Sequence, residues 1–147
     1  MAATTEVTQE NFQAVVAESE ECWLLEFYST MCGSCAEFEP TWHALEASDI
    51  GKSFKTARVN IDNNAGMQLA TALGVLQTGI PSVRVYTNEF NFDADAPILT
   101  GDEALLDLSV LTSRLQKVAD DLERNDEGIC IKRFPFATME DDLDVAE

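Results

Sequence analysis

The chain has 147 residues, and its 27 acidic against 9 basic side chains give a formal net charge of −18. This length suffices for one ordinary domain with a real core, since 46% of the residues are hydrophobic. Nucleic acid and anionic membranes both require a positive protein surface, so we predict that the chain binds neither. The negative charge is expected to keep the protein in solution or to dock it on a basic protein surface.

No apolar stretch approaches the roughly 20 residues that a membrane-spanning helix needs. Residues 1–6 contain neither the basic nor the apolar region of a secretory signal. We therefore expect a cytoplasmic or organellar location. A lumen of the endoplasmic-reticulum type stays open, because a signal that had been removed would leave no trace in this sequence.

The first half of the chain predicts alternating extended and helical segments. Residues 7–16 indicate a short extended start followed by a helix. Residues 22–29 are bulky and apolar except for Glu26, which is typical of a central strand covered on both faces. Residues 33–48 predict a helix, and Pro40 inside it removes a backbone hydrogen bond and is expected to kink the axis.

The second half continues the alternation and then changes it. Residues 54–61 predict a strand, and residues 65–73 predict a short helix. Residues 82–87 alternate with a period of two, which predicts a strand with one more polar face. A brief strand near 98–99 and a last helix over 102–124 complete the order β-α-β-α-β-α-β-β-α. This order predicts an α/β fold, with a mixed central sheet and helices on both of its faces.

The last part of the chain differs in character, so we predict a domain over 1–124 and a C-terminal extension over 125–147. Residues 129–136 are apolar and basic, and we expect them to pack on the domain or on a partner. Residues 140–147 are rich in acids and predict a solvated, disordered end.

Four cysteines are too few for a disulfide-stapled scaffold of this length. Cys22 stands at the start of an apolar strand and is expected to be a buried apolar side chain. For Cys130 three states stay open: buried, exposed, or paired with another protein.

The two remaining cysteines, Cys32 and Cys35, have the CxxC spacing and open the predicted helix 33–48. At a helix N-terminus the unpaired amides and the helix dipole stabilise a thiolate, which is the form that attacks disulfides. Zinc sites use the same spacing, but a zinc ion would need two more ligands, and the sequence has no second pair. We predict a redox pair, with no metal and no cofactor beyond a redox-active Cys32–Cys35 disulfide.

The order of the residues assigns roles within this pair. Cys32, nearer the helix start, is the predicted nucleophile, and Cys35, one turn in, is the predicted resolving thiol. Glu26 lies in an apolar strand, where burial raises the pKa of a carboxyl group, so it is the candidate for proton transfer with Cys35. Alternatively Glu26 is a paired structural charge. Arg58 on the next predicted strand is its expected partner under either interpretation.

Residues 6–124 resemble the thioredoxin superfamily. The resemblance depends on Glu26-Phe27-Tyr28 before the CxxC, Pro40 five residues after Cys35, Ile80-Pro81-Ser82 before a strand, and Gly101 before the last helix. Residues 25–28 and 38–42 look most like protein disulfide isomerase domains, and residues 81–86 are similar to the thioredoxin domain of quiescin sulfhydryl oxidase. The chain contains no flavin-binding module, so oxidase activity of this chain alone is not expected.

The resemblance implies a thioredoxin fold in which a cis proline, Pro81, lies opposite the cysteines. It also implies that backbone groups of Ile80 pair with an extended substrate peptide. The predicted substrate-binding residues are Met31, Gly33, Ser34, Ile80 and Pro81. Met31 stands where the family usually has tryptophan. Ser34 stands where thioredoxins favour proline and disulfide isomerases favour histidine.

The predicted function is thiol–disulfide exchange with protein thiols and disulfides. The alternative is a thioredoxin-like structural or adaptor subunit, which would dock in a larger protein complex through its acidic surface and residues 125–147.

Overall fold

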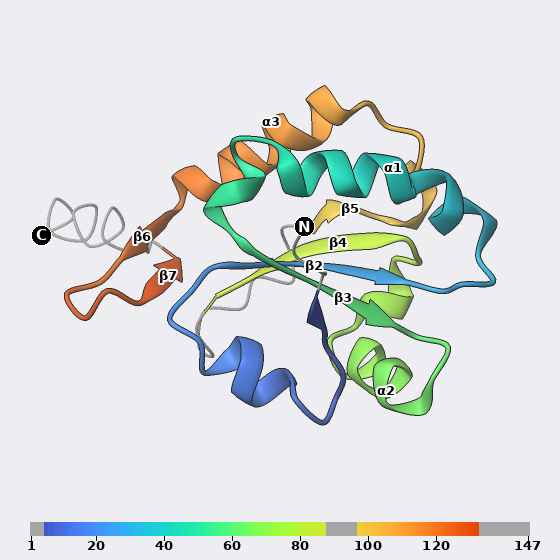
Figure 1. Ribbon diagram of the computed structural model, residues 1–147, viewed down its shortest axis with the longest axis horizontal. Helices are drawn as coiled ribbons and strands as arrows, with labels where there is room; N and C mark the ends of the chain where they lie inside the picture. Colours follow the sequence, from blue (N-terminus) through green and yellow to red (C-terminus); the bar gives the residue numbers. More distant parts are fainter. Residues whose placement is uncertain (1–4, 88–96, 133–147) are drawn as a thin grey trace, which may run out of the picture.

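The computed structural model describes residues 5–87 and 97–132, and a five-stranded mixed sheet lies at its centre (Figure 1). The strands are β1 (Thr5–Glu6), β2 (Trp23–Tyr28), β3 (Lys55–Asn60), β4 (Ser82–Tyr86) and β5 (Pro97–Leu99). They are arranged in the order β1-β3-β2-β4-β5. β3 is parallel to both β1 and β2, whereas β4 is antiparallel to β2 and β5. The predicted mixed sheet is confirmed.

Helices cover both faces of this sheet (Figure 1). The α-helices are α1 (Gly33–Ala47), α2 (Asn64–Ala72) and α3 (Leu108–Asp120). Near the N-terminus, Gln13–Ala17 forms a π-helical segment, and short 3₁₀ turns occupy Gly51–Ser53, Val75–Gln77 and Gly101–Glu103. α1 and α3 lie on one face, and α2 lies on the other with the N-terminal helical segment. Pro40 lies inside α1, as predicted.

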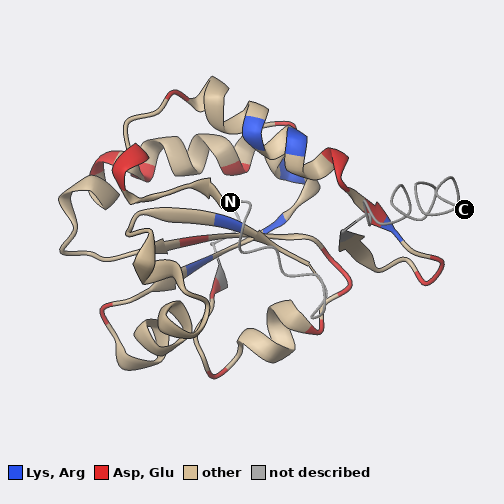
Figure 2. Cartoon of the chain, turned by 180° about the vertical axis from the view of Figure 1, so that it is seen from behind, with Lys and Arg blue, Asp and Glu red and all other residues tan. Residues whose placement is uncertain are grey.

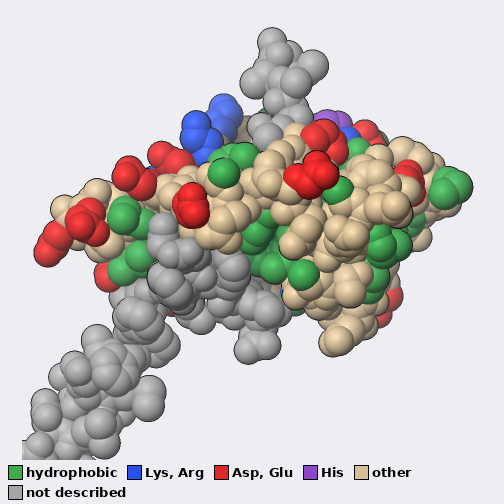
Figure 3. Space-filling model, turned by 90° about the horizontal axis from the view of Figure 1, so that it is seen from below, with side chains coloured by type: hydrophobic (Ala, Val, Ile, Leu, Met, Phe, Trp, Pro, Cys, Tyr) green, Lys and Arg blue, Asp and Glu red, His purple; other side chains and the backbone are tan. Residues whose placement is uncertain are grey.

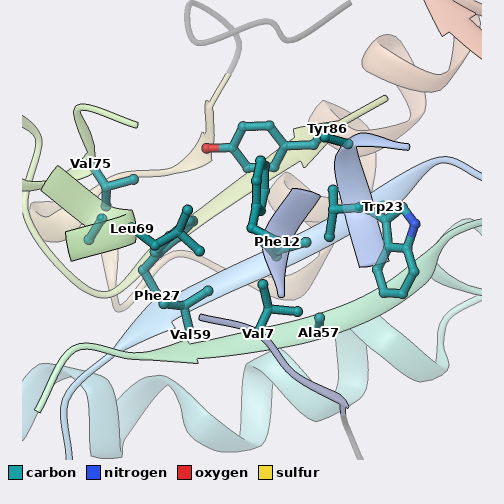
Figure 4. Close-up of a cluster of buried hydrophobic side chains, with 13 residues drawn as sticks. Val7, Phe12, Trp23, Phe27, Ala57, Val59, Leu69, Val75 and Tyr86 are labelled. Carbon is teal, nitrogen blue, oxygen red and sulfur yellow. The ribbon is translucent and has the colours of Figure 1, made fainter. Parts of the chain in front are cut away.

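The period-two geometry of the strands divides the buried side chains between two apolar clusters. Leu25 and Phe27 of β2 face the side of α2, where Phe12 packs edge-on against Tyr86 at 5.8 Å between ring centroids (Figure 4). Leu24 faces the opposite side and packs with apolar residues of α1 and α3. Glu26 shares the parity of Leu24, so its carboxyl group projects beneath α1.

The C-terminal part of the described chain corrects the predicted helix 102–124. A capping box between Thr100 and Glu103 opens a 3₁₀ turn, and α3 begins only at Leu108. After α3 the chain forms a hairpin of β6 (Leu122–Arg124) and β7 (Cys130–Lys132). The predicted helix 102–124 therefore included residues with other roles, since Leu105 is exposed and Leu122 belongs to β6.

A tight turn from Asn125 to Gly128 joins the two strands of this hairpin. Asn125 Oδ1 accepts hydrogen bonds from the backbone of Glu127 and Ile129, and Gly128 adopts a φ of 81° that favours glycine. The boundary that we expected after residue 124 falls between the two paired strands. Residues 133–147 lie outside the described residues, and with them the expected acidic end.

A disulfide between Cys22 and Cys130 joins this hairpin to the start of β2. The expectation that Cys22 is simply a buried apolar side chain is therefore wrong. Cys130 is paired within the chain, with its partner 108 residues away in the sequence. Arg124 adds a polar connection at the same place, because its Nη1 donates to the carbonyl of Glu20 at 2.7 Å and its Nη2 meets the Glu21 carboxylate at 2.9 Å.

Acidic side chains lie at several separate places on the face of the molecule that Figure 3 shows. Several of the few basic residues lie in strands or on α3 (Figure 2). Arg58, Arg114 and Arg124 each form an ion pair with a carboxylate, which reduces the free positive charge further.

Candidate active site

The two free cysteines of the described chain lie at the start of α1 in different environments. Cys32 is the N-cap residue, and its Sγ accepts a hydrogen bond from the backbone N–H of Cys35 at 3.1 Å. The other free amides of the first turn and the helix dipole also favour negative charge there. Cys32 is half-buried, whereas Cys35 is 3% exposed. The geometry makes Cys32 the more accessible of the two sulfur atoms.

Burial raises the pKa of the Cys35 thiol to about 12, and the hydrogen bond with Cys32 adds to this rise. A hydrogen bond from the Ser29 backbone opposes the rise without cancelling it. Cys35 therefore keeps its proton near neutral pH. To act as a nucleophile it needs a base.

Glu26 and Arg58 come together because they are register partners on the parallel strands β2 and β3. Arg58 Nε donates to Glu26 Oε1 at 2.7 Å, and the Glu26 side chain is fully buried. Burial raises the pKa of Glu26 to about 7, although the charge of Arg58 opposes this rise. The second carboxyl oxygen, Oε2, has no hydrogen-bond partner among the described residues. Such a carboxyl group can take up and release a proton near neutral pH.

Ile80 and Pro81 stand at the same edge of the sheet as the cysteine loop. Because β4 is antiparallel to β2, Ser82 pairs with Phe27, so the residues before Ser82 lie beside the end of β2. The Ile80–Pro81 peptide bond is cis. A hollow of about 520 Å³ adjoins it, and its walls are formed by Thr78, Gly79, Ile80, Thr100, Gly101 and Asp102.

Gly101 allows two loops to meet at this hollow. Its backbone N–H donates to the carbonyl of Thr78 at 3.0 Å. A Cβ atom at position 101 would lie 2.9 Å from the backbone carbon of Gly79, closer than real Cβ atoms approach. A larger residue here would therefore push the Ile80–Pro81 loop away.

The remaining predicted substrate-binding residues, Met31, Gly33 and Ser34, are exposed around Cys32. Met31 is 85% exposed, an unusual position for a large apolar side chain. It offers an apolar contact surface immediately before the first cysteine.

Asp62 was missed by the sequence analysis. It follows β3, and its carboxylate accepts hydrogen bonds from Ser29 Oγ at 2.5 Å and from the Thr30 N–H at 2.9 Å. These hydrogen bonds lower the pKa of Asp62. Ser29 Oγ in turn accepts from the Met31 N–H at 3.0 Å. Asp62 thus fixes the loop that leads to Cys32. The parallel pairing of β2 and β3, which brings their ends to one edge, was the available signal.

Glu39 and His43 of α1 were also missed as parts of the site. They follow Cys35 at intervals of four residues, so all three lie on one face of the helix. Arg58 Nη2 lies 3.3 Å from Glu39 Oε2, and Glu39 Oε1 lies 3.7 Å from His43 Nε2. A row of charged side chains therefore runs from Glu26 through Arg58 and Glu39 to His43 at the surface of α1.

Within residues 5–87 and 97–132, no three His, Cys, Asp or Glu side chains are grouped so that they could hold a metal ion. In the same ranges no helix is long and apolar enough to cross a membrane.

A thiol pair at a helix N-terminus, a buried carboxyl group on the strand before it and a cis proline at the same edge of the sheet define a dithiol protein of the thioredoxin type. The family model described as Thioredoxin matches residues 3–98, which is more than half of the chain. The chain belongs to the thioredoxin family.

Its curated relatives include protein disulfide isomerases. Protein disulfide-isomerase A6 of Homo sapiens is 31% identical over 83 residues, which are 55% of this chain and 18% of the relative. Protein disulfide-isomerase like 2-2 of Arabidopsis thaliana is 30% identical over 96 residues, 65% of this chain and 20% of the relative. The chain therefore spans about a fifth of the length of these relatives. The predicted similarity to disulfide-isomerase domains is confirmed.

Solved structures show the same fold. The thioredoxin of Malassezia sympodialis matches with a TM-score of 0.60 at 17% identity, over 80% of this chain and 94% of that one. Thioredoxin f2 of Chlamydomonas reinhardtii matches with a TM-score of 0.50 at 18% identity, over 59% and 77%. The thioredoxin fold implied by the sequence is confirmed.

Proposed function

We propose that the chain is a protein thiol–disulfide oxidoreductase that uses Cys32 and Cys35 as its redox pair. The Cys32 thiolate attacks a substrate disulfide, forms a mixed disulfide and releases one substrate thiolate. Cys35 then passes its proton to Glu26 and attacks the Cys32 sulfur, which releases the second substrate thiolate. The substrate gains two electrons, and the Cys32–Cys35 pair is left as a disulfide. We propose no cofactor beyond this pair.

One observation carries this proposal: Cys32 is accessible for attack on a substrate, whereas Cys35 is buried behind it, as the two steps of the reaction require. Cys32 is the N-cap of α1, where its Sγ accepts a hydrogen bond from the Cys35 N–H and is the more accessible of the two sulfur atoms. Cys35 is buried with a raised pKa, and the Glu26–Arg58 pair supplies an acid–base group near it. In this proposal Arg58 is the charge partner that keeps Glu26 able to release its proton again.

Substrates are proposed to be extended peptide segments around a disulfide. The backbone of Ile80 would pair with such a segment, while Pro81 offers no N–H group to compete. Met31, Gly33 and Ser34 would contact the residues next to the substrate cysteine. The recognition would then be mostly through backbone groups and would tolerate many sequences.

The experiment is a trapping assay with Cys35→Ser in the full chain. Without the resolving thiol, mixed disulfides on Cys32 persist and are found as complexes that reducing agent dissolves. Cys32→Ser/Cys35→Ser is the matched control and traps nothing. If Cys35→Ser traps no more protein than this control, the exchange function is wrong.

The adaptor alternative is favoured by one feature, the β6–β7 hairpin. It forms a sheet separate from the main one and is joined to β2 by the Cys22–Cys130 disulfide. An adaptor would form complexes that survive reducing agent and do not need Cys32. Truncation after Lys132 tests docking by the acidic end and leaves Cys130 in place.

Of the cytoplasmic and organellar locations left open by the sequence, we favour an oxidising organellar lumen. Disulfides persist in oxidising compartments and are rare in the cytosol of mesophiles. The Cys22–Cys130 disulfide therefore supports an organellar, lumenal setting over a cytoplasmic one. Free thiols can be alkylated while the native protein is extracted. We expect Cys22 and Cys130 to stay unalkylated because they form a disulfide, whereas alkylation of both would point to the cytoplasm.

A further inference from the structure

A row of charged side chains leads from the buried Glu26 to the outer surface of α1. The exposed fraction of the side chain rises along the row, from 0% at Glu26 and 13% at Arg58 to 44% at Glu39 and 52% at His43. Arg58 holds Glu26 through Nε and contacts Glu39 through Nη2. One guanidinium group is therefore shared between a buried carboxyl group and a half-exposed one.

The same glutamate also borders the resolving cysteine. Glu39 is one helical turn after Cys35. A cavity of about 220 Å³ lies at this place, and its walls are formed by Tyr28, Ser29, Thr30, Cys35, Ala36 and Glu39. Glu39 supplies the one carboxyl group among these six wall residues. Glu39 therefore contacts Arg58, the charge partner of Glu26, directly and shares a cavity wall with Cys35, which gives up its proton in the proposed transfer.

We propose that Glu39 is a positioning residue for the resolving step: by sharing Arg58 with Glu26, it sets how readily Glu26 takes the proton of Cys35. This inference rests on the proposed exchange function and deepens it. Glu39 itself does not contact the substrate in this proposal. It acts through the guanidinium group.

The charges around Glu26 fix the direction of the effect. Arg58 on β3 faces Glu26 directly, and Glu6 on β1 lies beyond Arg58. The other titratable groups around Glu26 are Tyr28 on β2 and Cys35, Glu39 and His43 on α1. Val83, which pairs with Glu26 on β4, is uncharged. Glu39 raises the pKa of Glu26, while Arg58 and His43 lower it. Removal of the charge at Glu39 therefore makes Glu26 a weaker base.

Arg58 is expected to stay in place when Glu39 is changed. Its guanidinium carbon lies 3.9 Å from the centre of the Tyr28 ring, and its Nε keeps the 2.7 Å contact with Glu26. Loss of Glu39 then removes one carboxylate that competes with Glu26 for Arg58, which lowers the pKa of Glu26 further in the same direction.

The test compares Glu39→Gln with Glu37→Gln. Glu37 is exposed on the same helix, so its substitution removes the same charge from another face of α1. The first readout is the carbon-13 NMR titration midpoint of the Glu26 carboxyl group in the reduced full chain. The second is the pH profile of the rate at which Cys35 resolves a mixed disulfide between Cys32 and a model peptide.

In Glu39→Gln we expect the Glu26 midpoint to fall by roughly half to one pH unit. The acidic limb of the resolving rate should move by the same amount, while Glu37→Gln leaves both unchanged. An unchanged midpoint in Glu39→Gln, or an equal shift in both variants, would overturn the inference. If the wild-type chain exchanges no disulfide at all, the proposed function fails, and the carboxyl midpoint alone still decides whether Glu39 controls Glu26.

Discussion

Removal of the Cys22–Cys130 disulfide should cost a large part of the stability of this domain. The bridge closes a loop with a sequence separation of 108 residues. For a loop of this length the chain-entropy relation gives a loss of about 4.8 kcal/mol at 25 °C, and losses of roughly 2–5 kcal/mol are usual when a native disulfide is removed. Single domains are stable by only about 5–15 kcal/mol, so the change is large.

The assay is urea denaturation of Cys22→Ala/Cys130→Ala, followed by the fluorescence of Trp23 and Trp42, both of which are buried. Cys32→Ser/Cys35→Ser is the control, because it changes two cysteines that form no disulfide in this structure. We expect a loss of at least about 2 kcal/mol for the first variant and a clearly smaller loss for the second. A loss under about 1 kcal/mol would show that the hairpin separates locally without weakening the main sheet, and would refute the reasoning.

Three further predictions concern the site. Because burial raises the pKa of Glu26 to about 7, its charged form is disfavoured in the folded state. The raised pKa stabilises the folded state at low pH, and this stabilisation is lost as the pH rises through about 7. In Glu26→Gln the free energy of unfolding should therefore fall by about 1–3 kcal/mol less between pH 5 and 8 than in the wild-type chain. An unchanged dependence of the unfolding free energy on pH would contradict the assignment. Gly101→Ala should destabilise the domain by about 1–3 kcal/mol and weaken peptide binding at Ile80, whereas Gly33→Ala, which meets nothing within 4 Å, should change stability far less. Equal effects of the two glycine substitutions would refute the role of the close approach. Ser34 adds no positive charge to favour the Cys32 thiolate, so the reduction potential in glutathione buffers should lie below roughly −190 mV and should rise in Ser34→His, and a wild-type value above that limit would be contrary to this expectation.

The polar centre of the site could be predicted because it follows from local rules. Glu26 is the one charged residue of an apolar strand, and Arg58 lies on the next parallel strand. Alternate residues of a strand point to the same face of the sheet, so the pairing of Glu26 with Arg58 brings both side chains together beneath α1. The cysteine pair was similarly predictable, because a CxxC that opens a helix places its first sulfur at the N-cap.

The contacts that the sequence did not reveal depend on distances in space. Cys22 and Cys130 meet because the chain reverses at Asn125 and Gly128, just beyond the predicted helix 102–124, and no local pattern links two cysteines so far apart in the sequence. Asp62 reaches the cysteine loop from the end of β3. Glu39 was visible at helical spacing from Cys35, but its contact with Arg58 depends on how α1 lies across the sheet.

The central claim is that Cys32 and Cys35 together carry out disulfide exchange with a protein substrate. The most direct measurement mixes the chain, with Cys32 and Cys35 as free thiols and Cys22–Cys130 bonded, with a disulfide-bonded protein such as insulin. The mixture is quenched with acid, and every cysteine is assigned by mass spectrometry. We predict that a Cys32–Cys35 disulfide forms in proportion to the two substrate thiols released, while Cys22–Cys130 stays intact. No Cys32–Cys35 disulfide, or electrons drawn from another cysteine, would contradict the claim.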